Sequence, residues 1–340
     1  MKGVKSWQFW VGILVSAAFL YYALRGLKLA EFWQAIITAN YWWLIPGVAI
    51  FFVDVWVRAW RWHYMLRPLK SIPTKTMFPI VTIGYMGNNI FPARAGELLR
   101  AAVLKDREGV PISASLATII VERIFDGVVM LSFVFLNLSE LARLTGSSGL
   151  VGNLNIRDVA LWGSMLFFGA LLVFLLAAMF PTVTERLVNY IIDHFVPTRL
   201  QKETRGLVMH FLSGLESLRS PKDALMIFLT TVVIWLLETG KYWFVMHAFQ
   251  FSVSFFALML MNGIVNLATT LPSAPGYVGT FDAPGIALLG AYSIPVAIAA
   301  SYTLVLHAAL WFPITVLGAY YYFRQPLRWG EDVEKLRVES

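Results

Sequence analysis

The chain has 340 residues, of which 58% are hydrophobic, whereas a soluble domain has roughly 45 to 50%. Its apolar residues form long uninterrupted blocks, which are typical of a membrane protein with several spans. The formal charge of +7 does not indicate nucleic-acid binding, because Lys and Arg flank the apolar blocks, and the absence of cysteine excludes disulfides and thiolate chemistry.

Six apolar blocks reach the roughly 20 residues that a helix needs to cross a bilayer core. They lie at 7–24, 41–60, 112–138, 159–180, 224–247 and 296–323. The first follows Lys2 and Lys5 but has no small-residue cleavage site before Arg25. We therefore interpret it as a retained anchor and not as a signal peptide.

Two further apolar segments are interrupted before they could cross. The first, 77–91, ends at Pro92, and the second, 255–271, ends at Pro272; a polar stretch and another short apolar segment follow each. Irregular backbone is tolerated at membrane depth only where protein or a wet cavity satisfies its polar groups, so each is predicted to be a re-entrant helical hairpin. The residues predicted at the hairpin turns are Pro92, Gly96, Pro272 and Pro275.

Lysine and arginine are distributed unevenly over this layout. If both hairpins return to the side that they entered, 19 of the 27 fall on one side, including all those in 58–75, and four fall on the other. Because cytoplasmic loops carry the excess of basic residues, both termini are predicted to face the cytoplasm of a multi-pass plasma-membrane protein. Four more, Arg94, Arg100, Arg123 and Lys241, lie within membrane segments.

The interrupted segments repeat with an offset of 180 residues, since Pro92-x-x-x-Gly96 corresponds to Pro272-x-x-x-Gly276. In the predicted topology the two units, about 41–138 and 224–323, have opposite orientations. Interrupted helices at matching places in inverted halves are typical of transporter binding sites. We predict an all-α polytopic membrane protein with about six transmembrane helices and two re-entrant hairpins in an inverted-repeat arrangement.

The chain is predicted to form one integral membrane domain over residues 1–325. Residues 183–219 form an amphipathic cytoplasmic linker with a break near Pro197, and 326–340 form a cytoplasmic tail. Amphipathic helices of this kind lie on the inner leaflet. A purely structural linker and a partner site explain the segment equally well.

Charged residues inside the membrane segments indicate function, because each costs on the order of 2.5 to 3.5 kcal/mol at the bilayer centre. Asp54 with Arg58, and Glu238 with Lys241, are spaced to pair along one helix, and such pairs could equally be structural. His307 is interpreted as a packed, hydrogen-bonded histidine in preference to a proton relay.

Glu122 and Asp126 share a helix face, so a cation from another element is expected between them, and Arg94 or Arg100 of the first hairpin is the candidate. Arg94 also lies where a short helix begins, and free backbone N–H groups beside an arginine make a site for phosphate or carboxylate.

The predicted substrate-binding residues are Asn88, Asn89, Arg94, Glu97, Arg100, Glu122, Arg123, Asp126, Gly276 and Gly279. Secondary candidates are Asp54, Arg58, Glu238, Lys241, Asp282 and His307. Enzyme and nucleotide motifs are absent, the five histidines are too scattered for a metal site, and no cofactor is expected. Glu122 and Asp126 could act as acid and base, but no nucleophile motif accompanies them.

Three sequence runs resemble one known family. They are GNNIFPARAGELLR at 87–100, VERIFDG at 121–127 and LPSAPGYVGTF at 271–281. Together they resemble the lysylphosphatidylglycerol synthase transmembrane-region family, also described as flippase-like proteins, and the resemblance covers roughly residues 7 to 325. In its bifunctional members this membrane part translocates an aminoacylated phospholipid that a separate cytoplasmic synthase domain makes.

The resemblance implies a stand-alone member without the synthase domain, because only 17 residues follow Phe323. The expected function is translocation of an anionic or aminoacylated phospholipid, or of a polyprenyl-phosphate-type lipid, and not an enzyme activity. An intramembrane lipid-modifying enzyme and a non-transporting scaffold of a lipid or envelope pathway are the alternatives. A membrane lipid is the expected partner, with a homo-oligomer or lipid-pathway proteins possible and no nucleic acid.

Overall fold

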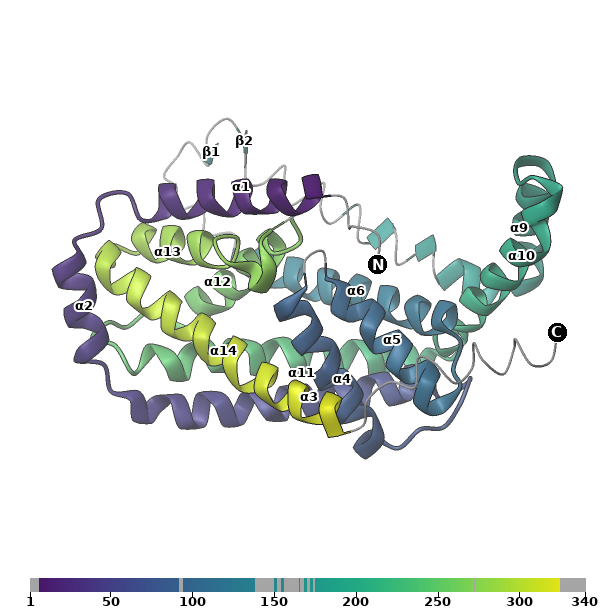
Figure 1. Ribbon diagram of the computed structural model, residues 1–340, viewed down its shortest axis with the longest axis horizontal. Helices are drawn as coiled ribbons and strands as arrows, with labels where there is room; N and C mark the ends of the chain where they lie inside the picture. Colours follow the sequence, from purple (N-terminus) through teal and green to yellow (C-terminus); the bar gives the residue numbers. More distant parts are fainter. Residues whose placement is uncertain are drawn as a thin grey trace.

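The computed structural model describes residues 6–91, 94–137, 150–151, 154–155, 165, 168–169, 172–173, 175–271 and 273–324. Within them the regular secondary structure is helical except for two two-residue strands, β1 (Leu150–Val151) and β2 (Leu154–Asn155), which pair antiparallel. Several long helices run along the longest axis of the body, and α14 (Val296–Arg324) crosses this view obliquely (Figure 1). The prediction of an all-helical chain is confirmed.

The predicted apolar blocks form the long helices. These are α1 (Ser6–Ala23), α3 (Leu44–Leu66) after the 3-10 turn η1 (Tyr41–Trp43), α6 (Ile112–Leu136), α11 (Pro221–Met246) and α14 (Val296–Arg324). Three described stretches are long and apolar enough to cross a membrane: Tyr41–Leu66, Pro221–Met246 and Val296–Arg324. Half of the predicted span 159–180 lies outside the described residues, and the short helix α2 (Leu29–Ile37) was not predicted.

Each interrupted segment forms two short helices. The first hairpin consists of α4 (Thr74–Ile90) and α5 (Ala95–Glu108), and the second of α12 (Phe255–Ala268), the 3-10 turn η4 (Pro275–Tyr277) and α13 (Asp282–Ala291). The two hairpins extend from opposite ends of the body and their tips meet, where α4 packs against η4 (Figure 1). Pro92 and Pro272 lie outside the described residues.

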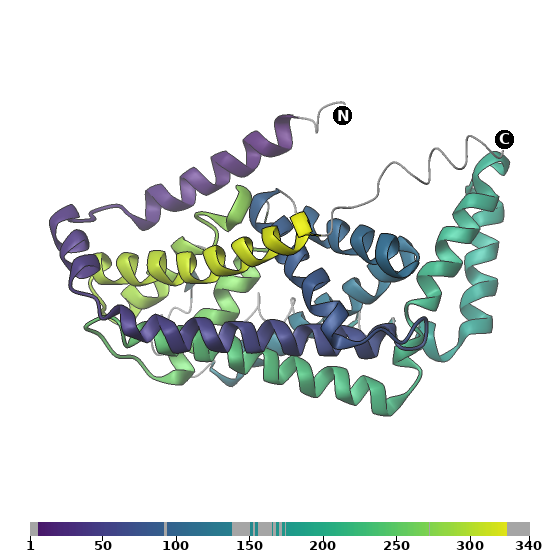
Figure 2. The same cartoon turned by 60° about the horizontal axis from the view of Figure 1, so that its bottom comes forward.

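The order of elements repeats along the chain as a long helix, two short helices and a long helix. Adding 180 to the bounds of α3 gives 224–246, which falls within α11, and adding 180 to the first residue of α5 gives 275, the first residue of η4. The bounds of α6 become 292–316, most of which lies in α14. Figure 2 shows α3 and α11, the first long helix of each unit, side by side along one edge of the body.

Gly96 allows helices α4 and α5 to pack closely against each other. A Cβ at this position would overlap the carbonyl oxygen of Gly84 and the amide nitrogen of Asn88, both backbone atoms of α4. Gly87 faces the same contact, because its Cβ would meet the Cα of Gly96. Small residues allow helix backbones to pack this closely in membranes.

An arm of two helices, α9 (Pro181–Phe195) and α10 (Thr198–Ser213), leaves the body at the end where α6 and α11 begin. It runs across the long axis of the body in both views (Figures 1 and 2). Exposed apolar side chains follow one face of α9 at helical spacing: Val183, Leu187, Tyr190 and Ile191. The 3-10 turn η3 (Glu216–Leu218) then connects the arm to α11.

Replacing Gly96 by alanine should destabilise the first hairpin. The added methyl group meets fixed backbone, so we expect the cost of overpacking, about 1 to 3 kcal/mol, seen as a lower unfolding temperature in detergent. Gly206→Ala is the matched control, since nothing lies within 4 Å of its Cβ position on the arm. It should be neutral or slightly stabilising, and equal unfolding temperatures for the two variants would contradict the packing described here.

Candidate functional site

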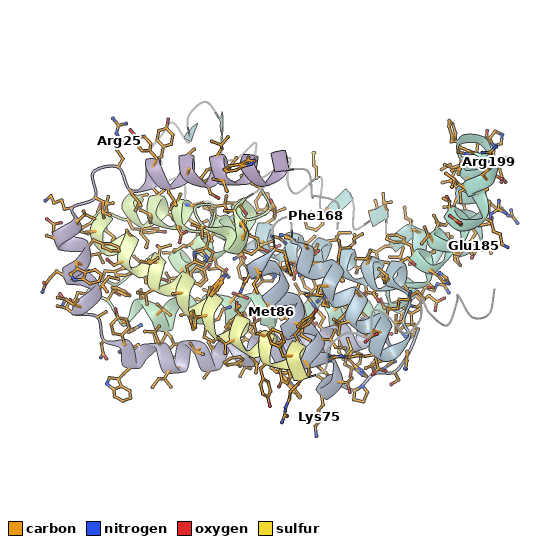
Figure 3. The ribbon with its side chains drawn as sticks, in the orientation of Figure 1. Arg25, Lys75, Met86, Phe168, Glu185 and Arg199 are labelled. Atoms are coloured by element: carbon orange, nitrogen blue, oxygen red, sulfur yellow. The ribbon has the colours of Figure 1, made fainter. Side chains whose placement is uncertain are left out.

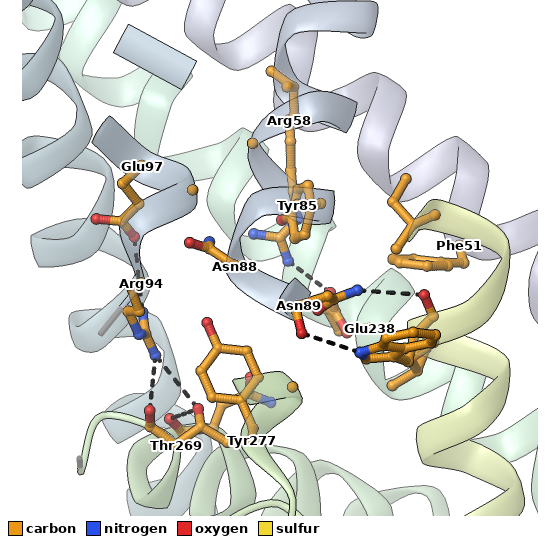
Figure 4. Close-up of a pocket in the computed structure, with 18 of the residues that line it drawn as sticks. Phe51, Arg58, Tyr85, Asn88, Asn89, Arg94, Glu97, Glu238, Thr269 and Tyr277 are labelled. Carbon is orange, nitrogen blue, oxygen red and sulfur yellow. Dashed lines mark hydrogen bonds and ion pairs between the residues drawn. The ribbon is translucent and has the colours of Figure 1, made fainter. Parts of the chain in front are cut away.

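A cavity of about 160 Å³ lies where the two hairpin tips meet, with α3, α6, α11 and α14 completing its walls (Figure 4). The predicted substrate-binding residues that line it are Asn88, Asn89, Arg94, Glu97, Arg100, Glu122, Arg123 and Gly276. The secondary candidates that line it are Arg58, Glu238, Lys241 and His307. Asp54, Asp126, Gly279 and Asp282 are not among the lining residues.

The first charge cluster joins α3 to α11. Arg58 bonds Asp54 on its own helix through Nε to Oδ2 at 3.1 Å, and Glu238 of α11 through Nη2 to Oε1 at 2.7 Å. Lys241 Nζ lies 2.5 Å from the other oxygen of Glu238. Both predicted intrahelical pairs are therefore present, and Arg58 adds a bond between helices that the sequence did not reveal.

The second charge cluster joins α3 to α6. Arg61 Nη1 lies 2.8 Å from Asp126 Oδ1, and Arg61 Nη2 lies 3.7 Å from Glu122 Oε1. The cation between the two carboxylates is thus Arg61, whereas the sequence suggested Arg94 or Arg100. Arg100 does pair with Glu122, at 2.5 Å.

The sequence prediction counts Arg58 and Arg61 among the basic residues of the segment 58–75, and the structure buries both of them. Helix α3 continues to Leu66, and this carries both arginines into the interior, where 5% and 1% of their surfaces are exposed. The apolar block 41–60 contains Arg58 and ends just before Arg61, because this second charge interrupts the hydropathy pattern.

The arginines of the site differ in how firmly they are held. Arg58, Arg61 and Arg100 each have a carboxylate oxygen at 2.5 to 2.8 Å, and the guanidinium of Arg100 also stacks 4.2 Å from the ring centre of Trp62. Charge-assisted hydrogen bonds of this length are the strong ones. These three side chains are fixed parts of the wall.

Arg94 is held loosely. Its Nη2 lies 3.4 Å from both the carbonyl and the hydroxyl oxygen of Thr269, and its Nη1 lies 3.9 Å from Glu97, which are long for hydrogen bonds. The side chain is 27% exposed, and the guanidinium lies 5.7 Å from the ring centre of Tyr277 (Figure 4). Arg94 also precedes α5 with a φ of 53°, a left-handed conformation that is uncommon outside glycine.

Arg123 is the second loosely held cation. Its side chain is 36% exposed, and it lies 3.5 Å from Glu97 and 3.5 Å from Asp126. Glu97 therefore stands between Arg94 and Arg123 and binds neither of them tightly. Both guanidiniums have N–H donors left over for a ligand.

The two clusters, counted together with Arg94, Arg123 and Glu97, carry more positive than negative groups. The cations are Arg58, Arg61, Arg94, Arg100, Arg123 and Lys241, and the carboxylates are Asp54, Glu97, Glu122, Asp126 and Glu238. Six cations face five carboxylates, so an anion that enters the cavity would balance the formal charge.

The tip of the second hairpin is closed by its own contacts. His307 Nδ1 lies 2.9 Å from Asp282 Oδ1, and His307 Nε2 lies 2.7 Å from the carbonyl oxygen of Gly276. The N–H of Gly279 donates to Asp282 Oδ2 at 2.9 Å. Both ring nitrogens of His307 thus lie within hydrogen-bond distance of an acceptor, and the amide of Gly279 already has a partner.

Sequence reasoning missed several lining residues, mainly aromatic and amide side chains: Tyr85, Trp235, Asn266, Tyr277 and Trp311. Trp235 Nε1 donates to Asp126 at 3.2 Å, and the amide of Asn89 donates to the hydroxyl of Thr315. Aromatic residues are frequent throughout this chain, so only Tyr277, inside the second glycine-rich run, carried a signal. In the described part of the chain no cluster of His, Asp and Glu could hold a metal ion.

Comparison with known proteins gives one matching family. The sequence model described as the lysylphosphatidylglycerol synthase TM region matches residues 9–318. Similar proteins include a UPF0104 membrane protein of Methanothermobacter thermautotrophicus, 26% identical with 82% of each chain covered. Another UPF0104 membrane protein, from Methanocaldococcus jannaschii, is 21% identical and covers 94% of this chain and 95% of its own.

A further relative is named glycosyltransferase AglD, from Haloferax volcanii. It is 28% identical over 303 residues, which are 81% of this chain and 47% of AglD. The chain therefore spans about half the length of that relative.

Breaking the bond between α3 and α11 should destabilise the protein. Glu238→Gln leaves Arg58 and Lys241 without a full counter-charge, and loss of one partner from a buried pair costs about 3 to 5 kcal/mol. Thermal unfolding in detergent measures the loss. Glu31→Gln, which affects an exposed pair between Glu31 and Lys28, is the control and should leave the unfolding temperature unchanged. An unchanged unfolding temperature in Glu238→Gln would contradict a stabilising bond between α3 and α11.

Proposed function

Because the chain belongs to the family of the lysylphosphatidylglycerol synthase transmembrane region, we propose that this membrane protein moves the headgroup of an anionic lipid from one leaflet to the other. One observation carries the proposal. Two loosely held arginines, Arg94 and Arg123, face a cavity between the hairpin tips in which cations outnumber carboxylates. A lipid phosphate is a ligand that planar guanidinium groups bind with paired hydrogen bonds.

In the proposed topology six helices span the plasma membrane and both hairpins are re-entrant, with both termini in the cytoplasm. Figure 3 supports this reading, because Lys75, Glu185 and Arg199 lie toward one end of the body and Arg25 toward the other. The first end would be cytoplasmic, in line with the excess of basic residues in its loops. The arm, with its exposed apolar face, would lie on the inner leaflet as part of the linker 183–219.

The two units, about 41–138 and 224–323, would be inverted repeats within one membrane domain, 1–325. The bond between Arg58 and Glu238 supports this relation, because the two residues are 180 positions apart, the same as the offset of the repeat. Equivalent positions contact each other only near the axis that relates the two units. The axis would therefore pass beside this bond. The tips of the two hairpins would approach the cavity along the same axis.

Within the cavity each residue type has a proposed role. Arg94 and Arg123 hold the phosphate, and Asn88, whose side-chain oxygen has no hydrogen-bond partner, binds a donor of the headgroup. Glu97 leaves the two arginines when the phosphate arrives and is then free to pair with an amino group. The same site thereby suits an anionic lipid or an aminoacylated one, while the acyl chains stay in the bilayer.

The chemistry of the headgroup beyond its phosphate is the open part of the proposal. The name glycosyltransferase, carried by AglD, favours a polyprenyl-phosphate-type lipid that carries a sugar. The family description favours phosphatidylglycerol or its lysyl form. All of these share the phosphate that the arginines would bind.

An intramembrane enzyme is the weaker candidate. A general acid or base has to face its substrate, whereas Arg100 lies 2.5 Å from Glu122 and Arg61 lies 2.8 Å from Asp126, so both carboxylates are already engaged by guanidiniums. We therefore assign both carboxylates to positioning Arg61 and Arg100. A scaffold without transport activity is the other alternative.

Reconstitution into vesicles tests the proposal. Acyl-labelled phosphatidylglycerol, its lysyl form and polyprenyl phosphate are offered beside phosphatidylcholine, and movement between leaflets is followed by quenching of the outer label. Arg94→Ala should slow movement of the phosphate-bearing substrate at least about tenfold, because a hydrogen bond to a charged group contributes about 1.5 to 3 kcal/mol. Arg67→Ala is the matched control, since Arg67 is exposed beyond the end of α3.

Mass spectrometry of the recovered lipids separates the alternatives. Unchanged lipid masses with accelerated movement are expected. A changed mass would favour the enzyme, and neither movement nor change over the whole lipid panel would favour the scaffold.

A further inference from the structure

The second hairpin is fastened to α14 through a histidine that lies between two acceptors. Asp282 offers a carboxylate oxygen to Nδ1 of His307, and Gly276 offers a carbonyl oxygen to Nε2. A neutral imidazole has one N–H donor, so it can satisfy only one of them. Both bonds form together only when a proton lies between Nδ1 and Asp282 and another lies on Nε2.

Loss of one proton therefore breaks one of the two bonds. If Nε2–H remains, the lone pair of Nδ1 faces the carboxylate of Asp282, and if Nδ1–H remains, the lone pair of Nε2 faces the carbonyl of Gly276. Two lone pairs in contact repel each other, so the ring or the turn has to move. The proton has an exit, because His307 lines the cavity.

The turn that these bonds hold is strained. Gly276, Tyr277 and Gly279 have φ angles of 72°, 61° and 85°. For tyrosine this conformation is a genuine outlier and persists only where the surroundings enforce it. Tyr277 also carries the ring that lies under the guanidinium of Arg94. Release of the turn from His307 would thus shift the surface against which Arg94 rests.

Other titratable groups surround His307. On the elements packed against α13 and α14 they are Tyr85 of α4, Arg58 and Arg61 of α3, and Glu238, Lys241 and Tyr242 of α11. The ionic ones pair with each other or with Asp54 and Asp126. Among the described residues, α1 and α12 bring no ionisable side chain to this place, and the pair Lys28 and Glu31 of α2 is exposed.

We propose that His307 and Asp282 form a proton-binding site whose occupancy sets the position of the second hairpin tip against Arg94. A bound proton keeps the tip closed, and its release to the cavity opens the tip. Coupling of this step to lipid movement rests on the function proposed above, whereas the response of the tip to pH does not. The site would make headgroup movement dependent on a proton gradient.

The absence of cysteine allows a direct test of the tip. Cysteines are introduced for spin labels at Leu98 and Val278, which are 57% and 43% exposed on the two hairpins, and the label separation is measured in the full-length protein. Between about pH 5 and about pH 8, where histidine titrates, the separation is expected to change. His307→Gln should abolish the change, and His247→Gln, at the far end of α11, should leave it intact.

A second variant keeps the test informative should His307→Gln fail to fold. Asp282→Asn removes the carboxylate that faces Nδ1 of His307, so the midpoint of the transition should change. A separation that is independent of pH in the parent protein, or a transition that survives in His307→Gln, would overturn the proton site. So would an unshifted transition in Asp282→Asn.

The lipid assay then separates the two proposals. With a pH gradient imposed across the vesicles, the ratio of rates with and without the gradient should exceed one in the parent protein and fall to one in His307→Gln. Arg94→Ala should lose movement under both conditions. A tip that responds to pH in a protein that moves no lipid would refute the proposed function and leave the proton site standing.

Discussion

Every arginine that this protein buries has to find its counter-charge on another side chain, because neither the packed interior nor hydrocarbon offers water to a guanidinium. Arg58 meets this requirement with carboxylates from two helices, Asp54 of α3 and Glu238 of α11. Arg61, one turn further along α3, meets it with Asp126 of α6. Ion pairs therefore join helix α3 both to α6 of its own unit and to α11 of the second unit.

The same requirement explains why some arginines in the cavity wall are tightly paired with carboxylates and others are not. Arg58, Arg61 and Arg100 each bind a carboxylate oxygen at short distance. The remaining two guanidiniums have only more distant carboxylate oxygens. The guanidinium nitrogens of Arg94 and Arg123 both lie near Oε1 of Glu97, at distances longer than a good hydrogen bond. A ligand anion could replace Glu97 as the partner of these two arginines without disturbing the ion pairs of Arg58, Arg61 and Arg100. Binding would then not require the surrounding helices to move.

The sequence was informative where the constraint is local. Bilayer thickness dictates the length of a span, and this located α3, α11 and α14, while proline and glycine located both hairpins. Charges are rare in apolar segments and were therefore easy to single out, and most of these charged residues line one cavity, although Asp54, Asp126 and Asp282 do not. Helix α2 was missed because nine residues are too few to register as a span.

The sequence could not reveal which distant side chains meet. The pairing of Arg58 with Asp54 follows from helical spacing, but its bond to Glu238 depends on α3 lying beside α11. Arg61 looked like a flank of the span, since a charge near the end of an apolar block ordinarily marks the membrane surface. Only the continuation of α3 to Leu66, and a partner 65 positions away on α6, give it an interior role.

The connection between the two units also has a mechanical consequence. Gly214, just after the arm, lies so close to α6 that a Cβ there would meet the carbonyl oxygen of Ala114 at 2.5 Å, and from this point η3 leads directly into α11. The last long helix of the first unit and the first long helix of the second are thus pinned together at one end. Were the two units to rock against each other, Gly214 would act as the fulcrum, and the widest swing would occur at the opposite end of the body.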